Sequence, residues 1–248
     1  MVGMISDIGN FRKLNEDFVG CIEEKAYRCY IVADGMGGHN GGEIASSTAV
    51  QYITDTINNS GETDDIDNLI RKTIDEANKE IYELARQKES LNGMGTTLTL
   101  CLVKGNMMKV ANIGDSSCFI LKDKKVEKVT KDHSLVQELI DSGSITEEEG
   151  KKHPNKNIIT RALGTKLDVK VDIFNVSLSE VEKVVLCTDG LSNSVSKDEM
   201  EEVLCKYDNN QRSCEELIEI SKRNGSKDNI SVIVFEGACE NEGNYTRD

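Results

Sequence analysis

Short apolar runs typical of strands alternate along this chain with segments whose apolar residues have helical spacing. Residues 27–33 (YRCYIVA) end at an Asp-Gly pair and predict a buried strand that carries a carboxylate at its end. The Gly-Asn pair at 105–106 predicts a tight turn between two strands. We expect the next two runs to continue that meander in one antiparallel sheet. The strand-like runs are 96–104, 107–113, 117–122, 125–130, 169–178, 181–187 and 230–235.

Two amphipathic helices are predicted between the first strand and the meander. From Gly42 onward, Ala45, Ala49, Ile53 and Ile57 recur at helical spacing, and residues 66–85 repeat this pattern. Further helices are predicted at about 197–206 and 211–223. Helix pairs that bracket many strands indicate an α+β layered domain with its helices on the outside.

Residues 131–164 interrupt this pattern. They are polar, carry the only proline, Pro154, and include two of the three histidines, with short helical stretches such as 135–140. We expect them to form a surface excursion or small subdomain. No linker composition is present, so residues 1–248 are predicted to be one domain that ends in a polar, frayed tail at 238–248.

Composition narrows the class of protein. With 30 Lys+Arg against 44 Asp+Glu, the net charge is −14, which argues against a nucleic-acid binder. No apolar run approaches the roughly 18 residues of a membrane span, and the first 20 residues lack a signal-peptide pattern, so a cytoplasmic protein is expected. The eight cysteines include no Cys-x-x-Cys pair and several lie in apolar runs, which favours buried free thiols over disulfides or a zinc site.

Four aspartates share one context. Each lies at the edge of a strand-like run beside Gly, Ser or Asn: Asp34, Asp115, Asp189 and Asp228. Taken singly, each is an ordinary turn residue. A cluster of such carboxylates would repel itself and would need cations, and hard oxygen ligands suit Mg²⁺ or Mn²⁺.

The glycine-rich stretch 34–43 (DGMGGHNGGE) fits neither dinucleotide-binding nor phosphate-loop patterns. Glycine there would let the backbone approach an ion, so that the carbonyl of Gly35 could be a ligand. Near the N-terminus, Arg12 lies close to Glu16 and Asp17. It could present its planar guanidinium to a phosphate or form a surface ion pair with Glu16, and spacing alone favours the ion pair.

Together these segments resemble the metal-dependent protein phosphatase family of type 2C, and its bacterial branch in particular. They occur in the family's order and span residues 4–236: SDIGNFRKLNED (6–17), VADGMGGHNGGE (32–43), GTT (95–97), ANIGDS (111–116), TRALG (160–164), CTDGL (187–191) and SKDNI (226–230). The resemblance implies a β-sandwich of two sheets flanked by helix pairs, in α-β-β-α layers, with residues 131–164 as a flap beside the site.

The resemblance also implies a binuclear Mn²⁺/Mg²⁺ centre. Asp34 would bridge two ions and the Gly35 carbonyl would join one of them, while Asp189 and Asp228 would hold the other. Asp115, with Asp189, would match a weaker third site. Glu16 and Asp17 would order the metal-bound waters, and Arg12 would bind the substrate phosphate. A histidine that follows the Asp-Gly pair in animal members is here Met36, so His39 is a candidate proton donor, with a loop-stabilising role equally open.

The implied activity is hydrolysis of phosphoserine and phosphothreonine in proteins by a water activated at two divalent ions. Partners would be phosphoprotein substrates and a cognate serine/threonine kinase, and the protein would be a monomer. No Cys-x5-Arg phosphate loop is present. One alternative is a catalytically silent binding module of the same fold, and another is a metal-dependent nuclease, which the acidic balance disfavours.

Overall fold

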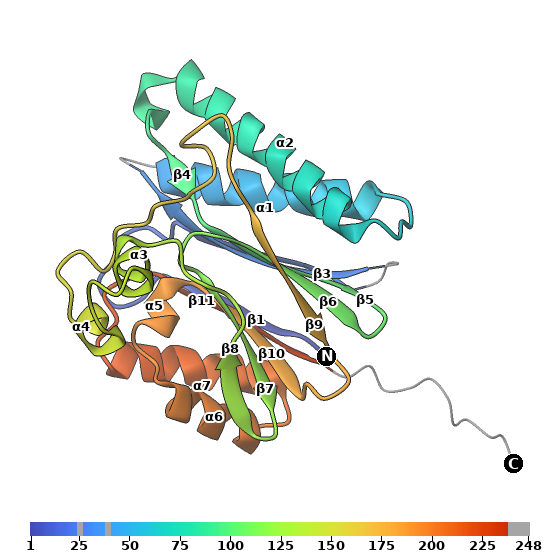
Figure 1. Ribbon diagram of the computed structural model, residues 1–248, viewed down its shortest axis with the longest axis vertical. Helices are drawn as coiled ribbons and strands as arrows, with labels where there is room; N and C mark the ends of the chain where they lie inside the picture. The colour runs from blue at the N-terminus through green and yellow to red at the C-terminus, as the bar shows by residue number, and fades with distance from the viewer. Residues whose placement is uncertain (24–26, 38–40, 238–248) are drawn as a thin grey trace, which may run out of the picture.

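Two antiparallel β-sheets pack face to face between two layers of helices (Figure 1). The computed structural model describes residues 1–23, 27–37 and 41–237. One sheet has the order β2-β3-β5-β6-β9, with β4 paired to β3: β2 (Asp17–Ile22), β3 (Arg28–Met36), β4 (Gly95–Thr96), β5 (Leu98–Lys104), β6 (Met107–Ile113) and β9 (Asp172–Ser177). The other has the order β1-β11-β10-β7-β8: β1 (Gly3–Asp7), β7 (Ser117–Lys122), β8 (Lys125–Lys128), β10 (Lys183–Cys187) and β11 (Ile230–Glu236).

The helices lie on the outer faces of the two sheets. In Figure 1, α1 (Gly41–Asn59) and α2 (Ile66–Gln87) cover the first sheet, while α6 (Lys197–Lys206) and α7 (Asn210–Arg223) cover the second. A 3₁₀ turn, η1 (Glu89–Leu91), follows α2, and a four-residue helix, α5 (Asp189–Ser192), follows β10. The predicted α+β layers, two sheets between helix pairs, are confirmed.

The central strands are mainly apolar because each is buried on both faces. In β3, Cys29, Ile31 and Ala33 pack with α1 and α2, whereas Tyr30 and Val32 pack between the sheets. A strand covered by helices on one side and by a second sheet on the other has no polar face. For this reason the sequence shows continuous apolar runs in place of an alternating pattern.

Two contacts mark the layer between the sheets. The rings of Tyr30 on β3 and Phe235 on β11 stack with their centroids 3.8 Å apart. The thiols of Cys101 on β5 and Cys118 on β7 lie 3.7 Å apart and are fully buried. The seven described cysteines are free thiols; five of them are buried, as predicted, whereas Cys21 is partly exposed and Cys205 is exposed.

The expected single meander is wrong. β5 and β6 pair in the first sheet, but β7 and β8 belong to the second, so the chain changes sheets between Ile113 and Ser117. Gly114, with a φ of +100°, allows this change of direction. Sequence patterns also missed β1 and β2, because both strands are short and mix apolar with polar residues.

The segment expected as a flap carries two short helices, α3 (Leu135–Asp141) and α4 (Glu147–Lys151). Its two ends meet at a narrow neck, where Ser134 bridges to Ile159 and the N–H of Thr160 donates to the carbonyl of His133. His133 also anchors the neck to the sheet-changing loop, since it exchanges two hydrogen bonds with Gly114: its N–H donates to the Gly114 carbonyl at 2.9 Å, and the Gly114 N–H donates to its Nδ1 at 3.1 Å. The flap is therefore fixed to the core beside Asp115.

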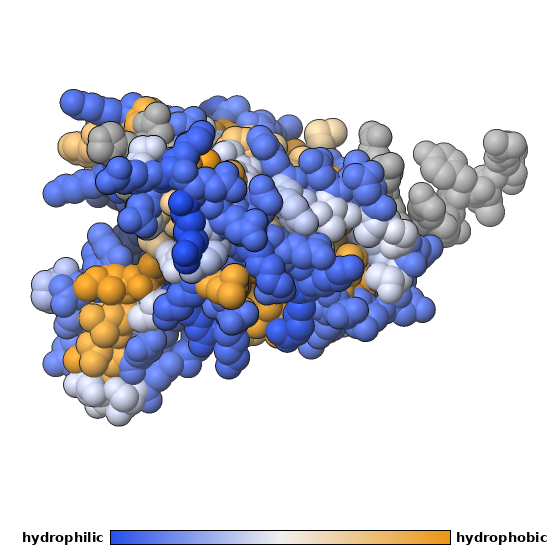
Figure 2. All heavy atoms as spheres, turned by 90° about the horizontal axis from the view of Figure 1, so that it is seen from above, coloured by the Kyte–Doolittle hydropathy of each residue, from blue (hydrophilic) through white to orange (hydrophobic). Residues whose placement is uncertain are grey.

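The face shown in Figure 2 is mainly hydrophilic, in keeping with a chain of which 30% is charged. Across the described residues, none of the helices is both long and apolar enough to span a membrane.

Candidate functional site

Asp34 lies near the end of β3, and its backbone is held on both sides. Its N–H donates to the Thr97 hydroxyl at 2.9 Å, and its carbonyl accepts from the Thr96 hydroxyl and the Thr97 N–H, each at 2.9 Å. The Thr97 hydroxyl is also 2.7 Å from that of Ser116. The GTT and GDS motifs thus fix the strand end that carries Asp34.

Asp17 pairs directly with Asp34 across β2 and β3 and is almost fully buried. Its Oδ2 accepts hydrogen bonds from the hydroxyls of Thr188 at 2.8 Å and Ser231 at 2.7 Å. Those hydroxyls come from the second sheet, so Asp17 joins the two sheets at this end. Burial raises the pKa of Asp17 to about 7, and the charge of Asp189 adds to the rise.

Asp189 begins α5, directly after β10. Burial raises its pKa to about 6, and repulsion by Asp228 adds to the rise. The neighbouring carboxyl of Asp34 opposes the rise, as do the charges of Arg12 and Lys156. Asp189 is thus in electrostatic contact with aspartates from both sheets.

Asp34 and Asp115 belong to the same group of buried carboxyls. Burial raises the pKa of Asp34 well above its ordinary value, and the charges of Asp17, Asp189 and Asp115 act in the same direction. Burial also raises the pKa of Asp115 to about 7, with Asp189 as the strongest repelling neighbour. The structure therefore brings the four strand-edge aspartates into one repulsive cluster.

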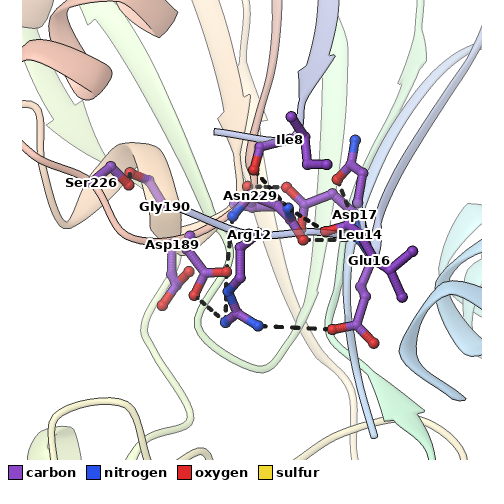
Figure 3. A network of polar contacts seen from close by, with 12 residues as sticks. Ile8, Arg12, Leu14, Glu16, Asp17, Asp189, Gly190, Ser226 and Asn229 are labelled. Atoms are coloured by element: carbon purple, nitrogen blue, oxygen red, sulfur yellow. Dashed lines mark hydrogen bonds and ion pairs between the residues drawn. The ribbon is translucent and has the colours of Figure 1, made fainter. Parts of the chain in front are cut away.

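Arg12 provides the positive charge beside this cluster (Figure 3). Its Nη2 lies 2.8 Å from Asp228 Oδ1, and its Nη1 lies 3.9 Å from Glu16 Oε2. Its side chain is 45% exposed, so one edge of the guanidinium still faces solvent. The ion pair with Glu16 considered from sequence spacing is present but long, and the closer partner is Asp228.

Asn229 positions the N-terminal loop that carries Arg12 and Glu16. Its side-chain N–H groups donate to the carbonyls of Ile8 at 3.0 Å and Leu14 at 2.9 Å, and its Oδ1 accepts from the Glu16 N–H at 2.9 Å. Loop and last strand are thereby held together across more than 200 residues of sequence. Figure 3 shows Asn229 directly behind Arg12.

These residues fit a group of divalent cations. Oxygens of Glu16, Asp17 and Asp189 are buried and lack a hydrogen-bond partner among the described residues. A Cβ on Gly35 would lie 2.1 Å from the carbonyl oxygen of Gly42, so only glycine allows this approach of backbone to backbone. Buried, mutually repelling carboxylates with free oxygens are the donor set that Mg²⁺ and Mn²⁺ prefer.

The carboxylates are close but are not arranged as a finished ligand set. Within residues 1–23, 27–37 and 41–237, no three His, Cys, Asp or Glu side chains are grouped so that they could hold one ion together. Asp228 is turned toward Arg12, and the neighbouring carboxylates repel one another. Binding of a cation therefore requires side-chain movement within the cluster.

Most residues singled out in the sequence lie together. Direct contacts or charge interactions link eight of them: Arg12, Glu16, Asp17, Asp34, Gly35, Asp115, Asp189 and Asp228. His39 lies outside the described residues. Sequence reasoning missed the polar residues that hold the site, although all of them lie in or directly beside the family-like motifs: Thr97, Thr188, Asn229 and Ser231.

Residues 12–224 match the family model of protein phosphatase 2C. The chain belongs to the protein phosphatase 2C family. It is 39% identical over 242 residues to the serine/threonine phosphatase stp of Listeria monocytogenes, with 96% of each chain covered.

Solved structures of phosphatases superpose on nearly the whole chain. The serine/threonine phosphatase Stp1 from Staphylococcus aureus has a TM-score of 0.90 at 31% identity, covering 95% of this chain and 94% of that one. The catalytic domain of the protein phosphatase PstP in complex with two manganese ions has a TM-score of 0.84 at 32% identity, covering 94% of this chain and 96% of that one.

Membership of the 2C family confirms the predicted class of enzyme. The chain is a metal-dependent protein-serine/threonine phosphatase, a hydrolase that depends on divalent cations. Nothing in these similarities supports the alternative of a catalytically silent module.

Proposed function

We propose that this 2C phosphatase hydrolyses phosphoserine and phosphothreonine esters of proteins at the carboxylate cluster, with two Mn²⁺ or Mg²⁺ ions. The observation that carries the proposal is the set of buried aspartates from both sheets, with unpaired oxygens, directly beside a half-exposed arginine. This combination suits phosphate-ester hydrolysis, because cations held by the carboxylates and a guanidinium would stabilise charge on the phosphate oxygens.

Each aspartate has a role in this proposal. Asp34 would bridge two ions and the Gly35 carbonyl would join one of them, while Asp189 and Asp228 would hold the other. Asp115 would contribute, with Asp189, to a weaker third site. When bound, two divalent ions lower the pKa of a water molecule and neutralise phosphate oxygens.

Arg12 would exchange partners during the reaction. Its pair with Asp228 at 2.8 Å occupies the guanidinium in this structure. With Asp228 holding an ion, Arg12 would be free of that partner, and its planar guanidinium could take two oxygens of the substrate phosphate. The exposed edge of the side chain already faces the approach of a substrate.

Glu16 and Asp17 would position the attacking water and accept its hydrogen bonds. Each keeps a buried oxygen without a partner among the described residues, which leaves one acceptor available on each carboxylate. The Asp17 carboxylate is held by Thr188 and Ser231, so its free oxygen has a fixed direction. His39 remains our candidate for the proton donor to the leaving oxygen.

We further infer that the 248 residues act as one domain and as a monomer in the cytoplasm, opposing a serine/threonine kinase of the same cell. The described cysteines are free thiols, as in a reducing compartment. The sequence similarity to phosphatases extends over 96% of the chain, which favours a single catalytic unit.

The test is phosphate release from a phosphothreonine peptide, with and without Mn²⁺ or Mg²⁺. Wild type is expected to be active only with the metal, and Asp189→Ala is expected to lose activity by a factor of at least about 100, since it removes a ligand. Asp198→Ala, which removes an exposed carboxylate at the start of α6, is the matched control and keeps activity. A wild type that binds the phosphopeptide but is inactive with both metals would sink the catalytic proposal.

A further inference from the structure

A pocket of about 430 Å³ opens directly beside the carboxylate cluster. Asp189 and Asp228 line it on the side of the cluster, whereas Lys156 and Asn157 of the flap and Lys227 line its other walls. The proposed hydrolysis uses the two aspartates but none of the other three residues. The pocket therefore extends the site toward a part of the substrate other than the reacting phosphate.

The wall between these lysines is built from polar groups that already have partners. The Asn193 amide donates to Asp189 Oδ2 at 3.0 Å, and the Asn224 amide donates to the carbonyl of Ser194 at 2.8 Å. The Ser194 hydroxyl donates to the Gly190 carbonyl at 2.7 Å. Because these hydrogen bonds fix the wall, it can accept a ligand without rearranging.

The two lysines are the positive charges of the pocket. Both are exposed, and neither forms an ion pair with another of the described residues. Lys156 lies close enough to Asp189 for its charge to act on that carboxyl. Asp189 and Asp228 would be coordinated in the loaded enzyme, which leaves Lys156 and Lys227 as the uncompensated charges there.

We propose that this pocket binds a second anionic group of the protein substrate, a carboxylate or a further phosphate that flanks the phosphorylated residue being hydrolysed. The inference rests on the proposed function, because the flanking group is carried by the same phosphoprotein. The substrate class is therefore acidic or multiply phosphorylated segments. The lysine from the flap and the lysine from the loop before β11 would both contact the anion, because both line the pocket.

The proposal is tested by reversing the charge of each lysine and by measuring the hydrolysis of peptides with different flanking residues. Four phosphothreonine peptides differ only in the flanking residues: alanine, glutamate, phosphoserine or lysine. Wild type is expected to show a kcat/KM about three- to fivefold higher for the glutamate peptide than for the alanine peptide, the range for exposed ion pairs, and higher again for phosphoserine. Lys156→Glu and Lys227→Glu are expected to abolish that preference or reverse it toward the lysine peptide.

Lys152→Glu is the matched control. It makes the same change of charge on an exposed flap residue four positions away that does not line the pocket. It should keep the wild-type preference. The second readout is binding, by fluorescence anisotropy, of the same peptides with the phosphothreonine replaced by a non-hydrolysable phosphonate analogue, to the wild type in saturating Mn²⁺. The order of affinities is expected to match, and to weaken as salt is raised.

Two results would overturn the inference. If wild type hydrolyses the alanine, glutamate and phosphoserine peptides equally well, or if Lys152→Glu changes the preference as much as Lys156→Glu, the pocket has no role in recognition and the proposed function stands. If no peptide is hydrolysed, including the alanine one, the proposed function falls and the inference falls with it. A response to phosphoserine but not to glutamate would assign the pocket to phosphate specifically.

Discussion

Asp34 is proposed to bind the metal ions needed for catalysis, but its charge lowers the stability of the metal-free fold. It is surrounded by the charges of Asp17, Asp189, Asp115 and Asp228, and burial adds to the cost of its ionised form. In the absence of a cation this repulsion opposes folding. Cation binding converts the same repulsion into affinity, because the cation neutralises charges that Arg12 neutralises only in part.

Asp34→Asn is therefore expected to stabilise the metal-free protein. Removal of one charge from the cluster should raise the free energy of unfolding by about 1 kcal/mol or more, which is ~2–4 °C in Tm for a domain of this size. The gain in Tm that Mn²⁺ gives the wild type should be lost. Thermal melts with EDTA and with Mn²⁺ measure both effects, and Asp198→Asn is the control. A lower metal-free Tm for Asp34→Asn would contradict this account of the cluster.

The same carboxyls predict an unusual dependence of stability on pH. Burial raises the pKa of Asp17 and Asp115 to about 7 and of Asp189 to about 6, above the ordinary value of 3.8. Because the folded state binds these protons more tightly than the unfolded state, their contribution to stability is complete below about pH 4 and is lost as the pH rises to about 7. Each such carboxyl lowers the free energy of unfolding by up to about 1.4 kcal/mol per pH unit in that window.

Metal-free protein should accordingly have a higher denaturation midpoint in urea at pH 5.5 than at pH 8. Saturating Mn²⁺ should reverse the trend, since cations bind the deprotonated carboxylates. Urea titrations at both pH values, with and without Mn²⁺, measure this. Equal urea midpoints at pH 5.5 and pH 8 in EDTA would contradict this prediction, because they would mean that ionisation of the cluster does not lower the stability of the fold.

Sequence reasoning found the acidic residues of the site but not the residues that hold them. Asp34 and Asp189 follow apolar runs, so their position at strand ends is local information. The hydrogen bond from Thr188 to Asp17 joins residues 171 apart, and that from Glu16 to Asn229 joins residues 213 apart. Pairings of this kind depend on how the two sheets pack, and no local pattern encodes them.

Among the elements, α2 does more than cover a sheet. Its buried residue Asn78 donates to the carbonyls of Lys166 at 3.0 Å and Leu167 at 2.8 Å, and accepts from the Gly164 N–H at 2.8 Å. These bonds hold the segment that returns from the flap to β9. One side chain thus sets where the flap rejoins the core.

Asn78→Ala is expected to lower the free energy of unfolding by about 1–3 kcal/mol, because the buried Gly164 N–H and two part-buried carbonyls lose their partner. It should also increase hydrogen exchange in residues 160–168, while residues 98–113 stay protected. Asn68→Ala, on the first turn of the same helix, is the comparison. Unchanged exchange in 160–168 would show that the segment is held by other contacts.

The apolar patterns predicted each helix pair and most strands, but not the partners of the strands. β6 and β7 are adjacent in sequence and lie in different sheets. Both strands have apolar residues on both faces, so their sequences are equally compatible with a place in the same sheet or in different sheets. The resemblance to a known family supplied the two-sheet arrangement that periodicity could not.

Considered as a whole, the molecule is held together by the layer between its sheets. Phe235 is 1% exposed and stacks on Tyr30 of the opposite sheet. Phe235→Ala should cost about 3–5 kcal/mol of unfolding free energy through the cavity it leaves. It should also weaken Mn²⁺ binding, because Asp228 lies just before the strand that carries Phe235. Denaturation and Mn²⁺ titration measure the two effects, and Tyr30→Phe, which keeps the ring stack and removes only the hydroxyl that donates to Glu23, should cost no more than about 1.5 kcal/mol and leave Mn²⁺ binding unchanged.

The pairing of β1 with β11 gives the order of events during synthesis on the ribosome. The first strand of the chain has no partner in its sheet until the last strand is made, since Ser6 pairs with Ser231 and Asp7 with Ile230. Asp228 and Asn229 are made only just before that last strand. A nascent or truncated chain that stops before Asp228 therefore has neither a closed sheet nor a complete set of acidic residues, and we expect it not to remove phosphate from proteins.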